Sequence, residues 1–456
     1  MQKRGSRAMV ESGQGDEGDR KSLGALRPHQ AITAVEESST SVGPTLEEVL
    51  EASNLKDAWM QVKRNRGSAG VDRMTIAEAE RWLEEHESVV TDRVRTETYR
   101  PAPVRRVDIP KPDGGTRTLG VPTVIDRWFQ QAVARVLSRW FDPTFSESSY
   151  GFRPNRSAHQ AVEAAKEYIA QGRRWVVDLD LEKFFDRVNH DVLMERLARR
   201  IADKRLLRLI RLWLSAGMMD ADGVVHDRTE GTPQGGPLSP VLANVLLDEL
   251  DKKLERAGHT FCRYADDVNV YVRSRRAGER VLAWMSHFLD STLRLKVNEA
   301  KSAVDRPWKR TFLGFSFTSG KVPKIRMAKT SLQRMHERVR RITSRRRGVS
   351  VPRIIDELNR YLRGWFGYYR LAETPSVFRD LDGWIRRRLR CFVVKKWKKA
   401  RAIRRNLRAL GVAEGSLTRG YSSWWPMSRH KSINQALGQT WFKQQGLLTL
   451  TTATNA

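Results

Sequence analysis

The sequence contains little cysteine, no long apolar run and a shortage of acidic residues. Only two of its 456 residues are cysteine, Cys262 and Cys391, and they form no Cys-x-x-Cys pair. This composition excludes a disulfide framework and gives no support to a structural zinc site, so we expect a reducing compartment. No stretch approaches the ~18 apolar residues that a membrane span requires, and the amino terminus lacks the apolar core of a signal peptide. We therefore expect a cytoplasmic protein without membrane contact.

The shortage of acidic residues leaves a large positive charge. The chain has 83 Lys and Arg against 53 Asp and Glu, a formal net charge of +30. Such a charge repels itself unless a polyanion is present, and nucleic acid is the usual one. Residues 321–410 alone hold 28 Lys and Arg against 6 Asp and Glu, a net charge of +22. This stretch predicts an RNA-binding region, with a solvated helix face as the alternative.

Aromatic residues are interleaved with these charges, and their rings suit RNA stacking as well as core packing. They are Trp365, Phe366, Tyr368, Tyr369, Trp384 and Trp397.

Composition and periodicity divide the chain into four parts. Residues 1–44 are rich in Gly, Ser, Glu and Arg, which predicts a disordered leader. The part at 45–327 mixes helical patterns with alternating strands, including a hairpin at 104–121. Its first helix begins at Thr45, a capping residue followed by glutamate three positions later, and Ser239-Pro240 predicts a serine-capped helix to about residue 256. Residues 328–410 predict three helices. Residues 411–456 form a basic tail of unassigned structure, for which analogy indicates binding to target DNA.

Two clusters of carboxylates carry the chemistry. Tyr264-Ala265-Asp266-Asp267 lies in a turn between two short strands, and the strand at 175–181 alternates so that Asp178 and Asp180 share one face. Adjacent carboxylates repel one another unless a divalent cation neutralises them, and an acid from the second strand would complete an oxygen site for Mg²⁺. The alternation alone does not choose between Asp178 and Asp180. Two acids in a turn can also be merely solvated.

Several further motifs, in a fixed order, accompany this turn. They are Ile109-Pro-Lys-Pro-Asp-Gly-Gly-Thr-Arg-Thr-Leu-Gly, Ser149-Tyr-Gly-Phe-Arg-Pro-Asn-Arg, Asp178-Leu-Asp-Leu-Glu-Lys-Phe-Phe-Asp, Gly231-Thr-Pro-Gln-Gly-Gly-Pro-Leu-Ser-Pro, Leu295-Lys-Val-Asn-Glu-Ala-Lys-Ser, Phe312-Leu-Gly-Phe and Leu358-Asn-Arg-Tyr-Leu-Arg-Gly-Trp-Phe-Gly-Tyr-Tyr. Together with the turn, they make residues 45–400 resemble the group II intron reverse transcriptases.

The resemblance implies an α+β right-hand polymerase, with fingers and palm at 45–327 and a helical thumb, domain X, at 328–410. It implies RNA-directed DNA synthesis with two Mg²⁺ ions, held by Asp180, Asp266 and Asp267 and by the main-chain carbonyl of Leu181. On this resemblance Asp180, and not Asp178, is the third ligand.

It also implies residues that bind the incoming nucleotide. Lys111 and Arg117 correspond to fingers residues that hold the triphosphate, with solvated hairpin charges as the alternative. Phe185 corresponds to an aromatic ring that blocks a ribose 2′-hydroxyl; a core phenylalanine is the alternative. Gln234 corresponds to a glutamine that contacts the nucleotide.

Three further positions follow from the same resemblance. The glycines at 235 and 236 would let the backbone approach the substrate closely. Lys301 corresponds to a palm lysine near the active site, although a surface lysine fits as well. Gly314 corresponds to the primer-grip turn, with a plain strand glycine as the alternative.

The implied partners are group II intron RNA, an RNA template with a DNA primer, target DNA and dNTPs. The implied roles are assistance to intron splicing and retrohoming by target-primed reverse transcription. A Cys-paired HNH endonuclease motif is missing, as in endonuclease-lacking bacterial members of the family. Two other functions stay open: a reverse transcriptase adopted for DNA repair or phage defence, and a non-enzymatic RNA-binding splicing factor.

Overall fold

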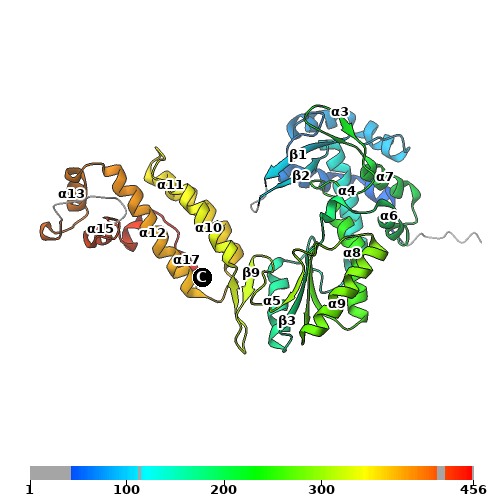
Figure 1. Ribbon diagram of the computed structural model, residues 1–456. Helices are drawn as coiled ribbons and strands as arrows, with labels where there is room; N and C mark the ends of the chain where they lie inside the picture. Colours follow the sequence, from blue (N-terminus) through cyan, green and yellow to red (C-terminus); the bar gives the residue numbers. More distant parts are fainter. Residues whose placement is uncertain (1–42, 111–113, 418–426, 454–456) are drawn as a thin grey trace, which may run out of the picture. The chain divides into compact units, whose positions relative to one another are not determined.

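A computed structural model describes residues 43–110, 114–417 and 427–453 (Figure 1). The predicted leader, apart from Gly43 and Pro44, lies outside the described residues. No helix in the described ranges combines the length and the apolar character that crossing a membrane requires.

The first part of the body is helical and packs around one long buried helix. The elements are α1 (Leu46–Leu50), α2 (Ala52–Asn65), α3 (Ile76–Arg95) and α4 (Val124–Phe141). Thr45 caps α1 by accepting a hydrogen bond from the backbone N–H of Glu48, which confirms the predicted start. Helix α4 is buried on nearly every side, because α1, α2, α3 and α8 all contact it.

The fingers sheet has the strand order β2-β1-β4-β5, with β1 (Val104–Pro110), β2 (Thr116–Val121), β4 (Met218–Met219) and β5 (Val225–His226). The predicted hairpin is confirmed: β1 and β2 pair antiparallel, with Ile109 opposite Arg117. The sheet is mixed and not purely antiparallel, because β4 joins β1 in parallel after a long excursion through the palm.

The palm sheet is antiparallel throughout, with the order β6-β7-β3-β8. Its strands are β3 (Trp175–Leu179), β6 (Thr260–Tyr264), β7 (Asp267–Val272) and β8 (Ala303–Asp305). Helix α5 (Ala158–Ala170) covers one face, and α8 (Ser239–Arg256) and α9 (Arg275–Phe288) cover the other (Figure 1). The neighbours Val176 and Val177 therefore point into two different cores.

Shorter elements complete the palm. They are α6 (His190–Ala198), α7 (Lys204–Ser215), the 3₁₀ turns η1 (Asp142–Thr144) and η2 (Phe184–Asp186), and the π-helical turn η3 (Leu289–Leu293). The predicted serine cap of α8 is wrong. Ser239 is the first helical residue, and its hydroxyl donates to the carbonyl of Pro233, where it closes the preceding loop.

The thumb follows a small hairpin of β9 (Phe315–Phe317) and β10 (Ile325–Met327). The three predicted helices are confirmed as α10 (Lys329–Ile342), α11 (Val351–Tyr369) and α12 (Pro375–Trp397). Trp365 and Phe366 lie in their shared core, so these two rings pack and are not free to stack on RNA.

The structure differs from the sequence-based prediction after residue 397. A fourth helix, α13 (Ala400–Ala409), is followed by η4 (Glu414–Ser416), α15 (Lys431–Ala436), α16 (Gln439–Gln444) and α17 (Leu450–Ala453). Ile433, Phe442 and Leu450 belong to the thumb core, and Asp382 of α12 accepts a hydrogen bond from the N–H of Leu450. The described part of the predicted tail is thus packed on the thumb. Its helices are short and bury single apolar residues, so the sequence shows no long periodic pattern there.

Candidate active site

The acidic turn joins β6 to β7 at one end of the palm sheet. Tyr264 pairs with Asp267, so Ala265 and Asp266 form a two-residue hairpin loop. Ala265 has a φ of +57°, a left-handed conformation that costs a non-glycine residue about 1 kcal/mol. The turn is tight and strained, and Asp266 and Asp267 follow each other directly where it ends.

The neighbouring strand β3 brings Asp180 to this turn. Its pairing with β7 ends at Leu179 opposite Val268, and the next step along the same register sets Asp180 opposite Asp267. Paired strands lie about 4.8 Å apart, so the two carboxylates leave adjacent backbones. Three acidic side chains from two strands therefore converge on one end of the sheet.

The structure also separates Asp178 from Asp180. Arg310 donates from Nε to Oδ2 of Asp178 at 2.7 Å, and its Nη2 forms an ion pair with the same oxygen at 2.7 Å. Among the described residues, the one ion pair of Asp180 is with the exposed ammonium of Lys301, whose Nζ lies 3.8 Å from its Oδ2. Asp178 is thus neutralised within the protein, while Asp180 is left to interact with a cation from solution.

The electrostatics of the turn reflect this crowding. Solvent reaches the Asp267 side chain only in part. This partial loss of hydration and the nearby carboxylates of Asp266, Asp178 and Asp180 raise the pKa of Asp267 to about 7. Burial raises the pKa of Asp266 as well; Asp180 adds to the effect, and Arg117 and Arg263 oppose it. A bound divalent cation would remove this repulsion.

Carboxylate oxygens are the donors that Mg²⁺ prefers, so the chemistry of this set fits the ion. In the described parts of the chain, however, no three His, Cys, Asp or Glu side chains are arranged closely enough to hold a metal. The fit therefore rests on the type of the donors and on the convergence of their backbones.

The motif at 295–302 fixes the backbone of Asp180. The Asp180 N–H donates to Ser302 Oγ at 3.0 Å, and its carbonyl accepts from the N–H of Asn298 at 2.8 Å. Leu181 forms an isolated bridge with Val297. Lys301, in the same loop, is 60% exposed, so its ion pair with Asp180 contributes little to stability.

Among the described residues, the fingers bring one cation near the acidic turn. Arg117 is exposed on β2 and lies close enough to Asp266 for its charge to favour the ionised carboxylate. Lys111 lies outside the described residues.

The glycine-rich loop at 231–236 lies between the fingers and η2. The N–H of Thr232 donates to the carbonyl of Phe185 at 2.6 Å, and the carbonyl of Gln234 accepts from the N–H of Gly120 at 2.9 Å. Phe185 is half-buried: it packs edge to face against Phe184 at the margin of the core, and part of the residue stays accessible.

The glycines of this loop permit close packing within the protein. A Cβ at Gly235 would lie 2.9 Å from the carbonyl oxygen of Gly120, and one at Gly236 would lie 2.5 Å from Oε1 of Gln130. The backbone of the loop can therefore approach the fingers and α4 closely. The predicted close approach to substrate stays a prediction.

Gly314 occupies a second tight turn. Phe312 and Phe315 exchange two backbone hydrogen bonds of 2.9 Å, with Leu313 and Gly314 at φ values of +51° and +79°. Tyr368 of α11 donates to the carbonyl of Leu313 at 2.8 Å, so the turn is fastened to the thumb. The left-handed conformation at this position favours glycine. An ordinary strand position would not.

Sequence reasoning did not identify the residues that support these groups. Arg310 and Ser302 contact a carboxylate or the backbone of the site from 122 or more residues away, and Arg263 contacts the carbonyl of Ala265 two residues after it. Only Arg263 had a local signal: it is a charged residue at an inward-facing position of a strand.

The comparisons agree with this geometry. The family "Reverse transcriptase (RNA-dependent DNA polymerase)" matches residues 109–317, which hold the end of β1, all of β2, the palm sheet and all the carboxylates above. The family "Group II intron, maturase-specific domain" matches residues 332–411, the thumb helices. The fold and the first of these matches define a reverse transcriptase domain. With its maturase-specific domain, the chain belongs to the group II intron reverse transcriptases and maturases.

Individual relatives are similar over part of their length. Protein YkfC of Escherichia coli (strain K12) is 32% identical over 254 residues, 47% of this chain and 66% of YkfC. Group II intron-encoded protein LtrA of Lactococcus lactis subsp. cremoris is 37% identical over 196 residues, 43% of this chain and 32% of LtrA. The chain thus spans less than two thirds of each. A telomerase structure from Candida albicans aligns with a TM-score of 0.42 and 12% identity over 69% of this chain and 63% of the telomerase chain.

Proposed function

We propose that this protein is an RNA-directed DNA polymerase that extends a DNA primer along an RNA template, using dNTPs and Mg²⁺. The observation that carries the proposal is the register of β3 against β7, which sets Asp180 opposite Asp267 beside Asp266. Three carboxylates from two strands are the donor set that two-metal phosphoryl transfer needs.

Asp180, Asp266 and Asp267 would hold the metal ions, with the main-chain carbonyl of Leu181 as a further ligand. When bound, such ions lower the pKa of a primer 3′-hydroxyl and stabilise the leaving pyrophosphate. Lys301 partly neutralises Asp180 before the ions arrive.

Arg117, together with Lys111, would bind the triphosphate, since cations on a hairpin can approach phosphate oxygens. Gln234 would contact the nucleotide. Phe185, part of which stays accessible, would exclude a 2′-hydroxyl and so favour deoxynucleotides.

Primer extension on an RNA template tests the catalytic proposal. We expect Asp180→Asn and Asp266→Asn to lose extension while RNA affinity stays unchanged, because the charge they lose is small beside +30. Asp178→Asn is the matched control, since it lies on the same face of the same strand but is paired with Arg310. It should retain much of the activity. Full extension by Asp180→Asn would refute the assignment.

We further propose that the thumb region binds intron RNA to assist splicing, and that the protein acts on target DNA in retrohoming. The support is the charge of residues 321–410, where 28 cations exceed 6 acids too far to be neutralised internally. Binding of an intron transcript should be tighter than binding of an unrelated RNA of equal length at every salt concentration, because specific contacts add affinity to that of counterion release. Equal affinity and equal salt dependence for both RNAs would reject a maturase role. It would favour a reverse transcriptase detached from an intron.

A further inference from the structure

A completely buried ion pair lies behind the acidic turn. Arg263 is in β6, one residue before Tyr264, and its side chain is 0% exposed; its partner, Asp251 of α8, is also 0% exposed. Burying two charges is expensive, and apolar residues of similar volume commonly serve stability as well or better. Stability alone therefore does not explain why a guanidinium occupies this position.

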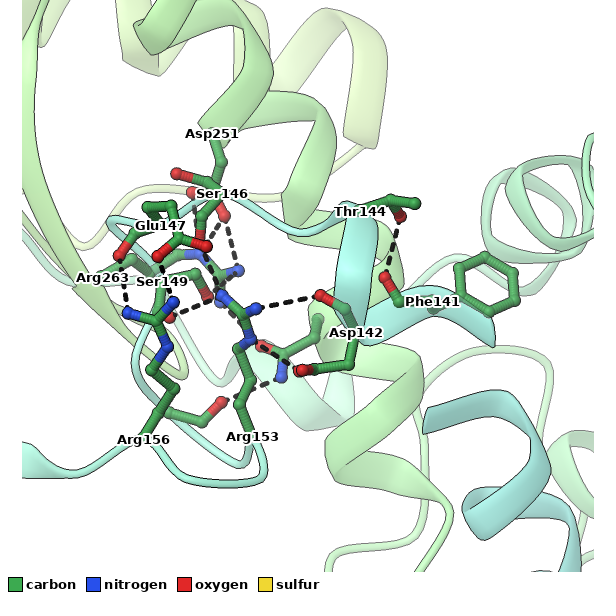
Figure 2. Close-up of polar contacts among 12 residues, drawn as sticks. Phe141, Asp142, Thr144, Ser146, Glu147, Ser149, Arg153, Arg156, Asp251 and Arg263 are labelled. Carbon is green, nitrogen blue, oxygen red and sulfur yellow. Dashed lines mark hydrogen bonds and ion pairs between the residues drawn. The ribbon is translucent and has the colours of Figure 1, made fainter. Parts of the chain in front are cut away.

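The contacts of Arg263 suggest what it does (Figure 2). Nε and Nη2 both donate to the carboxylate of Asp251, and Nη2 also donates to Ser149 Oγ at 2.7 Å. Nη1 donates to Asn244 Oδ1 at 2.9 Å and to the carbonyl oxygen of Ala265 at 3.0 Å. Every N–H of the planar group thus has an acceptor, and one of those acceptors is the backbone of the acidic turn itself.

The opposite side of the turn is held by the same network. A Cβ at Gly151 would lie 2.3 Å from the backbone nitrogen of Ala265, so the loop carrying Gly151 packs directly against the turn. Asn244, which accepts from Arg263, donates from Nδ2 to the carbonyl of Gly151 at 2.9 Å. One guanidinium and one amide therefore fix both the turn and the surface that it rests on.

A second buried arginine holds the same loop without reaching the turn. Arg153, with a side chain 3% exposed, pairs with Asp142 and donates to the carbonyls of Ser146 and Ser149 (Figure 2). It resembles Arg263 in burial and in having a carboxylate partner. It differs in that its hydrogen bonds go to Asp142, Ser146 and Ser149 and not to residues 264–267.

We infer that Arg263 is a positioning residue for the polymerase: it holds the strained Ala265 turn so that Asp266 and Asp267 face Asp180. The inference rests on the proposed function and deepens it. Ala265 adopts its left-handed conformation at a cost in energy, and a hydrogen bond to its carbonyl from a rigid, fully satisfied donor opposes relaxation of the turn. Lysine keeps the charge at either arginine position but cannot reach all these acceptors at once.

The test compares Arg263→Lys with Arg153→Lys in the full chain. Both variants should lower the melting temperature, because each leaves buried acceptors unpaired. Only Arg263→Lys should also lower kcat by roughly 10- to 100-fold, as expected for misplaced reacting groups, and raise the Mg²⁺ concentration at half-maximal rate. KM for dNTP should change little, because the fingers residues are untouched.

Binding of Mn²⁺ by titration calorimetry provides a readout that does not need polymerase activity. Mn²⁺ binding should weaken in Arg263→Lys and not in Arg153→Lys, whether or not the parent protein extends a primer. A parent protein that extends no primer would reject the proposed function but not the positioning role. Equal metal requirements in both variants, or losses that merely follow the melting temperature, would overturn the inference. If Arg263→Lys does not fold, Asn244→Ala, which removes one acceptor and the link to Gly151, is judged by the same criteria.

Discussion

The turn formed by Phe312, Leu313, Gly314 and Phe315 gives a prediction whose size follows from the structure. Gly314 has a φ of +79°, and a methyl group there would lie 2.8 Å from the hydroxyl of Tyr369. For Gly314→Ala, the left-handed conformation costs about 1 kcal/mol, and displacing the neighbours adds a comparable amount. We expect a loss of roughly 2–3 kcal/mol in the free energy of unfolding.

The contacts around the turn explain why it cannot move away freely. The carbonyl of Gly314 accepts from the N–H of Ala328 and from Ser331 Oγ, each at 3.0 Å. A shift large enough to relieve the methyl contact would lengthen these bonds. The loss should therefore appear in thermal and urea denaturation followed by circular dichroism.

A double-mutant cycle separates the two contributions. In a Tyr369→Phe background the hydroxyl is gone, so Gly314→Ala should cost less, keeping the conformational cost of about 1 kcal/mol and the remaining contact with Ser331 Oγ at 3.1 Å. Gly364→Ala, where the new methyl meets open space on α11, should be neutral or slightly stabilising. An equal cost for Gly314→Ala in both backgrounds, or no cost in either, would refute the reasoning.

Two further predictions concern single side chains. Burial and the nearby Asp251 raise the pKa of Asp248 to about 6, above the ordinary 3.8, so its ionisation opposes folding, and stability falls as pH rises from about 4 through 6. Asp248→Asn should raise the melting temperature at pH 7.5 by an amount equivalent to at most about 3 kcal/mol and change it little near pH 4; the same gain at both pH values would contradict this origin. Phe185→Val should let ribonucleotides be incorporated, measured as the ratio of kcat/KM for dNTP and rNTP, because part of the residue is accessible. An unchanged ratio would leave Phe185 a packing residue only.

Local patterns in the sequence were sufficient for the elements that carry the site. The alternation around Asp-Gly-Gly predicted the β1–β2 hairpin, and the apolar residues flanking Tyr264-Ala265-Asp266-Asp267 predicted the turn between β6 and β7. Helical spacing predicted α10, α11 and α12. These features depend on residues a few positions apart, whose side chains share a face of one helix or strand whatever the rest of the chain does.

The tertiary structure decided what those patterns left open. Asp178 and Asp180 are equivalent in a strand of period two, and they differ only because Arg310, 132 residues from Asp178 in sequence, pairs with one of them. The burial of Arg263 behind the turn requires α8 and the loop before α5 to meet β6. Charge pairing and burial of this kind depend on which distant segments come together. The periodicity within a single segment carries no information about those long-range contacts.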